Sequence, residues 1–159
     1  MSQNSFEKAK KHLEGFGLAH KVKVFDVSSA TVALAAAALG TEEERIAKTL
    51  SFSLGDSAIL VVAAGDAKVS NHKFKEAFGK KAKMLSFSEV EEIIGHGVGG
   101  VCPFGVNEGV KVYLDESLKR FQTVYPAAGT ASSAVELTIP ELQAASEAVG
   151  WVDVTTLPQ

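Results

Sequence analysis

The sequence is poor in residues that form covalent cross-links or hold metal ions. It contains one cysteine, Cys102, among 159 residues, which excludes an intramolecular disulfide and a zinc site built from several cysteines. Its four histidines lack a ligand spacing such as His-x-x-x-His. The P-loop and the Gly-x-Ser-x-Gly nucleophile motif are absent from the sequence as well. We therefore expect no metal and no cofactor.

Long apolar runs and a large excess of charge are also missing. No apolar stretch of the sequence is long enough to span a bilayer. The N-terminal segment MSQNSFEKAKKHLEGFG has no apolar signal core. We therefore expect a cytoplasmic protein without a membrane partner. The net charge of −3 disfavours reliance on many phosphate contacts, and with it DNA as a partner. The length predicts one domain over residues 1–159.

Positive charge is nevertheless concentrated in one segment. Six lysines fall between residues 68 and 83, where Glu76 is the only acidic residue. Such a run is typical of a solvated helix face, but it can also form a local patch for a polyanion. The sequence leaves both interpretations open.

The pattern of apolar residues predicts an α/β fold with a mixed sheet. Residues 48–54 alternate at period two, and Gly55-Asp56 turns the chain into the apolar run 58–64. These segments predict a β-hairpin whose second strand is buried on both faces. Capping-box patterns predict helix starts at Thr41–Glu44, Ser88–Glu91 and Thr138–Glu141. Further expected elements are a buried helix over 31–39, helices over 6–16 and 72–78, and strands over 22–25, 110–114, 123–127, 134–138 and 151–156.

Residues 95–105, GHGVGGVCPFG, contain five glycines and predict an irregular loop. Gly95, Gly97 and Gly100 match the pattern G-x-G-x-x-G. A helical pattern precedes them and no long helix follows, so the dinucleotide-binding interpretation fails. Two interpretations remain. The glycines can serve tight turns, or they can let bare backbone groups approach a ligand and stabilise an oxyanion.

Two side chains near these motifs have reactive groups. Cys102 lies six residues after His96. A cysteine nucleophile needs a base within hydrogen-bond reach and a third group that orients the base, and no such set is visible; a free cysteine is more often a small buried apolar group. Lys48 begins the first strand of the hairpin, a position at which lysine is usually exposed.

Four segments together carry a resemblance to a known family. They are IAKTLSF (46–52), LVVAAGDAKVS (60–70), the glycine loop GHGVGGVCPFG, and YPAAGTASSAVELT (125–138). In this order they resemble the YbaK family of aminoacyl-tRNA deacylases, free-standing relatives of the editing domain inserted in bacterial prolyl-tRNA synthetases. The likeness covers roughly residues 24 to 155. Its most specific parts are Lys48 before Thr-Leu and the G-x-x-x-P loop from Gly99 to Pro103.

The resemblance implies a fold, an activity and partners. The implied fold is a mixed, largely antiparallel sheet surrounded by helices, with the pocket between the lysine strand and the glycine loop. The implied activity is hydrolysis of the ester that joins a wrong amino acid to the tRNA, with water as the attacking group. The partners would be the aminoacyl-tRNA acceptor end and an aminoacyl-tRNA synthetase. A non-catalytic module that binds a tRNA end or a synthetase is the alternative, and a small-molecule hydrolase using Cys102 is a third hypothesis.

The resemblance also assigns residues. Lys48, Gly99 and Gly100 would carry catalysis: Lys48 would contact the aminoacyl-adenosine end, and the loop backbone would position the carbonyl. Members that act on cysteinyl-tRNA have a serine and an aspartate where this chain has Ala127 and Ala134, so alanine, 2-aminobutyrate, serine or threonine is favoured over cysteine. The expected substrate-binding residues are Phe25, Ser28, Thr31, Thr49, Val101, Cys102, Pro103 and Gly129, and the expected tRNA-binding residues are Lys73, Lys75, Lys80 and Lys81.

Overall fold

The fold is organised around the predicted β-hairpin. The computed structural model describes residues 5–97 and 100–158. In it, β2 (Ile46–Ser53) pairs antiparallel with β3 (Ala58–Ala64) over seven residue pairs. Every residue of β3 is buried, which confirms that neighbours cover this strand on both faces. Gly55 in the connecting turn has a φ of 97°, a conformation that glycine adopts without steric cost.

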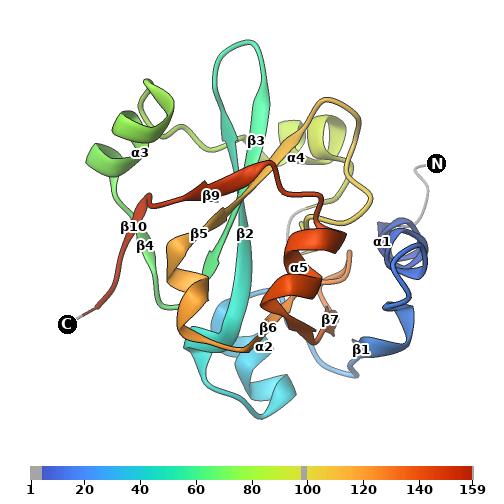
Figure 1. Ribbon diagram of the computed structural model, residues 1–159. Helices are drawn as coiled ribbons and strands as arrows, with labels where there is room; N and C mark the ends of the chain where they lie inside the picture. The colour runs from blue at the N-terminus through green and yellow to red at the C-terminus, as the bar shows by residue number, and fades with distance from the viewer. Residues whose placement is uncertain (1–4, 98–99, 159) are drawn as a thin grey trace.

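The hairpin lies at the centre of a six-stranded mixed sheet (Figure 1), which confirms the α/β class. Parallel neighbours flank it: β6 pairs with β2, and β5 pairs with β3. Within this sheet the β2–β3 and β6–β8 pairings run antiparallel. The strand order is β8-β6-β2-β3-β5-β9, with β5 at Lys111–Asp115, β6 at Thr123–Pro126, β8 at Leu137–Thr138 and β9 at Gly150–Val152.

Two small antiparallel sheets lie beside the main one. β1 (Val22–Val24) pairs with β7 (Ser133–Val135), and β4 (Lys68–Val69) pairs with β10 (Thr155–Thr156). The strand expected over 134–138 is thus two strands, because the chain leaves β1 and joins β6 within a few residues.

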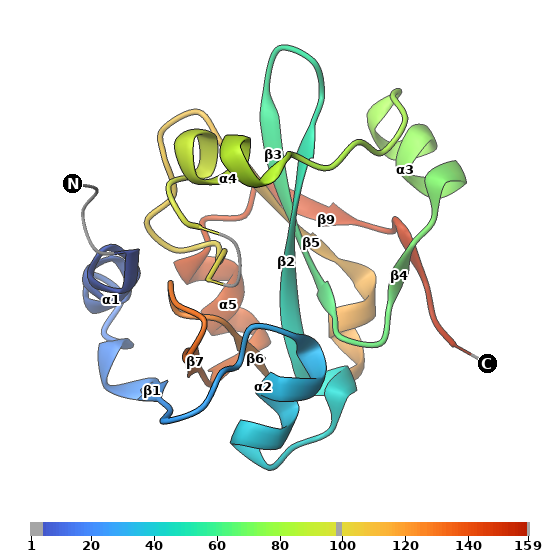
Figure 2. The same cartoon turned by 180° about the vertical axis from the view of Figure 1, so that it is seen from behind.

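Helices cover both faces of the sheet. In Figure 1, α3 lies to the left of the β2–β3 hairpin, whereas α1, α4 and α5 lie to its right, and Figure 2 shows the same division from behind. No helix among the described residues is long and apolar enough to cross a membrane. The helices are α1 (Ser5–Glu14), α2 (Val32–Leu39), α3 (Asn71–Phe78), α4 (Phe87–Ile94) and α5 (Ile139–Ala145), and 3-10 turns occur at Ala19–Lys21, Glu43–Arg45 and Glu116–Arg120.

The capping signals were correct for α5 and misplaced for α4. Thr138 and Glu141 form the predicted capping box. In α4 the box is formed by Ser86 and Glu89, two residues before the predicted pair, and the Ser86 amide donates to the Glu89 carboxylate at 2.9 Å. α4 therefore begins at Phe87. The expected cap at Thr41 is wrong, because the 3-10 turn there begins after Glu42 without a side-chain cap.

The buried residues lie on both sides of the sheet. One cluster contains Phe52 and Phe74, whose ring centroids are 4.7 Å apart, and packs α3 against the hairpin. A larger cluster lies under α1, α4 and α5. The prediction of a buried helix over 31–39 is only partly met, because Ala35 and Ala36 are buried whereas Leu34 is 45% exposed. α2 is therefore a covering helix with one apolar face open.

Candidate active site

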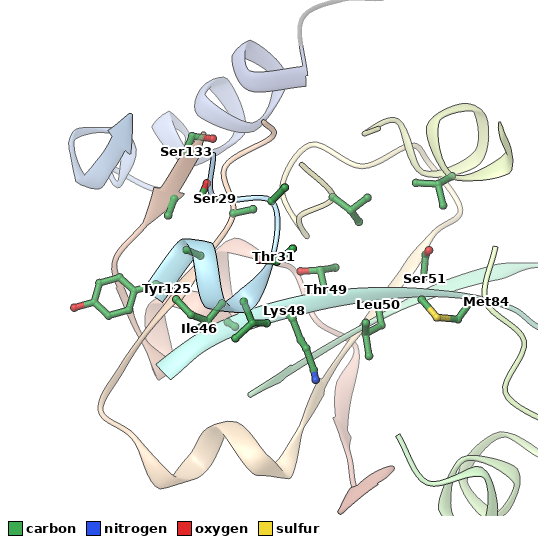
Figure 3. A pocket seen from close by; sticks show the side chains of 18 of the residues that line it. Ser29, Thr31, Ile46, Lys48, Thr49, Leu50, Ser51, Met84, Tyr125 and Ser133 are labelled. Carbon is green, nitrogen blue, oxygen red and sulfur yellow. The ribbon is translucent and has the colours of Figure 1, made fainter. Parts of the chain in front are cut away.

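A cavity of about 350 Å³ opens beside β2 (Figure 3). Its walls are mostly apolar. The volume falls within the range of small-molecule sites. The side chains around it come from five places: the loop and helix 29–35, strand β2, the segment 84–90, the glycine loop at residue 101, and the stretches of chain that meet at β6 and β7. The lining residues are Ser29–Val32, Ala35, Ile46–Ser51, Met84, Leu85, Phe87, Val90, Val101, Tyr125, Ala127, Ser133 and Ala134.

The cavity exists because β2 lacks a neighbour along part of one edge. β6 pairs only with Ile46 and Ala47 at the start of β2. Toward the other end, the segment before α4 takes over: the amide of Leu85 donates to the carbonyl of Ser51 at 3.2 Å, and the amide of Ser53 donates to the carbonyl of Lys83 at 2.8 Å. The three residues between, 48–50, have β3 on one side and the cavity on the other.

The ladder pattern shows which backbone groups face this gap. In an antiparallel pair, alternate residues direct both of their backbone polar groups toward the partner strand, and the residues between direct them away. Ser51 and Ser53 direct groups away from β3, as their bonds to the segment 83–85 show. Thr49 lies two residues before Ser51 in the same strand, so its amide N–H and carbonyl point into the cavity.

Two hydroxyl groups in the cavity wall also lack protein partners. Within the described part of the chain, Ser29 Oγ and Thr49 Oγ1 are buried and have no hydrogen-bond partner. Both residues line the cavity. A buried hydroxyl without a partner costs about 1–3 kcal/mol, so each is a group that rotation about one bond could offer to a polar ligand.

The Lys48 side chain leaves β2 on the side opposite to Thr49 (Figure 3). Its ammonium group donates to the carbonyl of Gly65 at 3.3 Å and to the carbonyl of Ala67. An ammonium has three N–H donors, so one remains for another acceptor. Burial lowers the pKa of Lys48, while the charges of Asp66 and Asp115 act in the opposite direction.

Lys48 therefore has a structural task that the sequence did not reveal. Its amine ties β2 to the turn between β3 and β4, at the lower wall of the cavity. The expected contact of Lys48 with the aminoacyl-adenosine end stays a prediction. The position at the cavity wall agrees with the expected one, because the residue is among those that line it.

The glycine loop reaches the cavity through Val101. Gly100 is buried and lies against the chain at residues 129–130: a Cβ on Gly100 would be 2.5 Å from the carbonyl oxygen of Gly129. Gly129 itself has a φ of 96°, and a Cβ there would be 2.5 Å from the carbonyl oxygen of Ser5. Both glycines thus permit close packing of backbone on backbone. Gly99 lies outside the described residues, so the expected role of its backbone stays a prediction.

Cys102 and His96 form a sealed pair behind the cavity. Both side chains are fully buried, and the sulfur of Cys102 is 3.6 Å from His96 Nε2. Burial raises the pKa of the Cys102 thiol to about 12, and burial lowers the pKa of His96. The imidazole Nε2–H donates to the carbonyl of Phe104 at 2.6 Å, and the Ser5 hydroxyl donates to Nδ1. A thiol in this setting is inert. Cys102 is not among the residues that line the cavity, so its expected contact with substrate stays a prediction.

The remaining expected pocket residues divide into two groups. Thr31 lines the cavity, and its hydroxyl caps α2 by accepting from the Leu34 amide at 3.1 Å. Phe25, Ser28 and Pro103 are not among the lining residues. The Ser28 hydroxyl accepts from the Ala30 amide at 3.2 Å, so it shapes the loop that delivers Ser29 to the cavity.

The structure brings Ala127 and Ala134 together at the cavity wall. The two residues form an isolated antiparallel bridge, and both line the pocket. Adjacent positions that could hold a polar pair thus hold two methyl groups. The wall here is apolar and offers no side-chain hydrogen bond to a substrate.

Sequence reasoning missed Met84 and Phe87, which line the cavity from the segment before α4 and from the first turn of α4. Met84 is 55% exposed and Phe87 80% exposed. A signal was present, because a phenylalanine four residues after a lysine-rich run and next to a helix cap is a poor candidate for the core. The prediction of the helix cap at Ser88 placed Phe87 outside the helix, so its position at the cavity was not recognised.

The expected tRNA-binding lysines lie on α3 and on the segment that follows it. Lys73 is tied to Asp153 at 3.1 Å and to the carbonyl of Thr155 at 2.8 Å. The Lys80 amine donates to the carbonyl of Leu54 at 2.5 Å. Lys75 and Lys81 are exposed. In Figure 2 the segment after α3 crosses in front of the β2–β3 hairpin and ends at α4, so it leads toward the cavity.

The cavity and the mixed sheet are consistent with the fold of one known protein family. Residues 26–145 match the family described as the Aminoacyl-tRNA editing domain. Because this match covers most of the chain, the protein belongs to that family, and the resemblance noted from the sequence is confirmed.

Individual relatives narrow the comparison. A protein of Bacillus subtilis (strain 168) named "Uncharacterized protein YwhH" is 51% identical over 151 residues, which is 94% of this chain and 96% of that protein. The Proline--tRNA ligase of Halalkalibacterium halodurans is 36% identical over 90 residues, which is 56% of this chain but only 16% of the ligase. A solved structure titled as "a putative trans-editing enzyme for prolyl tRNA synthetase" has a TM-score of 0.87 and 30% identity, and the match covers 98% of this chain and 99% of that one.

Proposed function

We propose that this protein is a free-standing editing enzyme that hydrolyses the ester bond of mischarged aminoacyl-tRNA carrying a small amino acid. One observation carries the proposal: the edge of β2 at Lys48–Leu50 that has no partner strand. There this member of the editing-domain family exposes backbone and hydroxyl groups inside an apolar cavity. The relatedness to a putative trans-editing enzyme supports action apart from a synthetase.

The chemistry requires little from side chains. An aminoacyl ester is already activated, so positioning and electrostatic stabilisation suffice for its hydrolysis. The oxygen of water attacks the ester carbonyl carbon, the bond to the ribose oxygen breaks, and that oxygen takes a proton as the amino acid leaves. In this proposal the Thr49 amide donates to the carbonyl oxygen as negative charge develops on it, and the third N–H of Lys48 binds a polar group of the aminoacyl-adenosine end. The glycine-loop backbone at 99–100 completes the positioning.

The described cavity wall contains hydroxyl groups but no histidine or carboxylate that could activate one as a nucleophile, which supports direct attack by water. The cysteine of this chain is fully buried with a raised pKa. The adjacent ribose hydroxyl of the substrate is the group we propose to assist the water, since the described cavity wall contains no histidine or carboxylate.

The wall composition supports a small substrate. Ala127 and Ala134 place methyl groups where a polar pair would recognise a thiol-bearing side chain. We therefore propose alanine, 2-aminobutyrate, serine or threonine as the amino acid removed, with cysteine disfavoured. One methylene is worth only about 1–3 kcal/mol in an apolar pocket, so neighbouring substrates of this series should be separated by modest factors.

The test is a deacylation assay over tRNAs charged with alanine, 2-aminobutyrate, serine, threonine, cysteine and proline. We expect hydrolysis of at least one small aminoacyl ester and little of cysteinyl-tRNA. Hydrolysis of none, with the folded state verified by circular dichroism, would reject the enzyme.

A binding module that holds the acceptor end without turnover is the second candidate. One observation favours it: the Lys48 amine already donates to two carbonyls of its own chain. Tight binding of charged tRNA without hydrolysis in the same assay would select this alternative.

A further inference from the structure

The mouth of the cavity carries two exposed apolar side chains. Met84 is 55% exposed and Phe87 is 80% exposed, and both also line the cavity. We call these two residues the rim. Burying an exposed phenylalanine ring is favourable, so a ring left open at a pocket mouth is a candidate contact for a ligand that extends out of it.

The local structure holds Phe87 in this open position. The capping box of Ser86 and Glu89 fixes the start of α4, so Phe87 is the first residue of the helix. Val90 and Ile94, one and two turns later, are the buried residues of the same helix. Within the described part of the chain, no other aromatic ring stacks on Phe87.

Positive charge lies directly before the rim. The segment between α3 and α4 carries the exposed residues Lys80, Lys81 and Lys83 and then reaches Met84. Its backbone is anchored to the hairpin, because the Lys83 carbonyl accepts from the Ser53 amide. The acidic residues of α4, Glu89, Glu91 and Glu92, follow the rim. An anionic backbone would therefore approach across the lysine segment rather than along α4.

An exposed aromatic ring beside a positively charged track is the arrangement with which proteins bind single-stranded nucleic acid. We propose that the rim is a subsite for an unpaired base at the 3′ end of RNA, with the base stacked on the Phe87 ring and covered at one edge by Met84. The lysine segment carries the adjoining phosphates. This inference rests on the proposed function for the identity of the RNA end, and it adds a base-binding platform outside the cavity.

The test measures binding of an uncharged acceptor-stem minihelix with a single-stranded 3′ end, so it does not depend on turnover. Loss of one base–aromatic stack corresponds to about a 5- to 150-fold loss of affinity. We expect Phe87→Ala to weaken binding by a factor in this range and Phe87→Trp to retain it. The matched control is Phe16→Ala, which removes another partly exposed ring, 41% exposed, that does not line the cavity.

A second RNA makes the assignment specific. A minihelix with an abasic residue at its 3′ terminus should bind the parent protein as weakly as the complete minihelix binds Phe87→Ala. Combining the abasic RNA with Phe87→Ala should cause no further loss. Equal losses for Phe87→Ala and Phe16→Ala, or additive losses in the combined case, would overturn the subsite.

The outcomes separate this inference from the proposed function. If the parent hydrolyses a charged tRNA and Phe87→Ala has the same KM and the same RNA affinity, the base subsite is rejected and the proposed hydrolase activity is supported. If the parent hydrolyses nothing but binds the minihelix in a Phe87-dependent way, the enzyme fails and the subsite stands. A change from dimer to monomer in Phe87→Ala during sedimentation, without a change in RNA affinity, would assign the rim to a second copy of the chain and overturn the proposal.

Discussion

Two neighbouring regions of this molecule contain groups that can take part in acyl chemistry, and they differ in access. The free edge of β2 has an open cavity, backbone groups of Thr49 and the amine of Lys48, but the described lining contains no thiol, histidine or carboxylate. The Cys102–His96 pair has a thiol 3.6 Å from an imidazole nitrogen, but both side chains are fully buried. The region that a substrate can enter lacks a nucleophile paired with a base, and the region that has a thiol beside an imidazole is closed.

The difference shows how a reactive residue type can have a purely structural task. The carbonyl of Phe104 accepts from His96 and lies 3.7 Å from the Cys102 sulfur, so the pair holds the glycine loop against α1 through the Ser5 hydroxyl. Desolvation then shifts both groups toward their neutral forms. An enzyme built on the open region must use water and binding energy in place of a covalent intermediate.

The largest expected effect concerns the open region. Lys48→Met keeps the apolar stem and removes the ammonium, and we expect kcat/KM for deacylation to fall by about 10- to 150-fold, the usual cost of losing one hydrogen bond from a charged group to the substrate. The melting temperature must be measured too, because the amine also binds the carbonyls of Gly65 and Ala67.

Lys68→Met is the control for that experiment, since Lys68 is an exposed lysine near Lys48. Turnover by Lys48→Met equal to that of Lys68→Met would remove Lys48 from the proposed catalytic set.

Charge reversal on the approach to the open region should have the next largest effect. Replacing Lys80 and Lys81 together with glutamate should raise the KM for charged tRNA by about 10-fold and flatten its salt dependence, because phosphate contacts release counterions. The same reversal at Lys73 and Lys75 on α3 is expected to do less, since Lys73 is already paired with Asp153. Unchanged affinity in all four positions would assign the lysines to a solvated surface.

Thr49→Val separates the role of the Thr49 hydroxyl from that of the Thr49 backbone amide at the open edge of β2. The change removes only the hydroxyl and leaves the amide N–H in place. We expect kcat/KM to fall about 3- to 10-fold, the value of one hydrogen bond, with no loss of thermal stability because Oγ1 has no protein partner. A loss as large as that of Lys48→Met would indicate that the hydroxyl, and not the amide, contacts the reacting carbonyl.

The sealed region should respond to pH through stability. Burial lowers the pKa of His96 from its ordinary value of 6.5. Below pH 6.5, His96 therefore binds a proton in the unfolded chain more readily than in the folded chain. The contribution is therefore complete above pH 6.5 and is lost as pH falls below it, at up to about 1.4 kcal/mol per pH unit. We expect His96→Gln to flatten the pH dependence of unfolding between pH 7 and 5. A slope as steep in His96→Gln as in the parent would contradict this assignment.

The smallest effect is expected for the thiol. Cys102→Ala should change kcat/KM by less than about twofold, because the sulfur is buried and its pKa is about 12. A thiol reagent should modify Cys102 only after unfolding in denaturant. Rapid labelling of the native protein with loss of turnover would show that Cys102 is accessible and would support a covalent mechanism.

Much of the local structure could be predicted from the sequence. The hairpin of β2 and β3 follows from alternation and an apolar run, and Gly40, Gly79 and Gly95 end helices in left-handed conformations. Lys48, Thr49, Thr31 and Val101 line the cavity as expected. Capping was less reliable, since Ser86 and Ser88 lie two residues apart and both are followed three residues later by glutamate.

Periodicity and capping signals act over a few residues, so the sequence by itself determined the β2–β3 hairpin, most helices and the segment that holds the pocket lysine. Only the tertiary structure decided which groups a ligand can reach. It closed Cys102 behind Gly100 and Gly129, where backbone lies on backbone, joined Ala127 to Ala134 in the cavity wall, and tied the Lys48 amine to the next turn. The physical reason is that access depends on contacts between segments far apart in the chain, and no local pattern records which of them will meet.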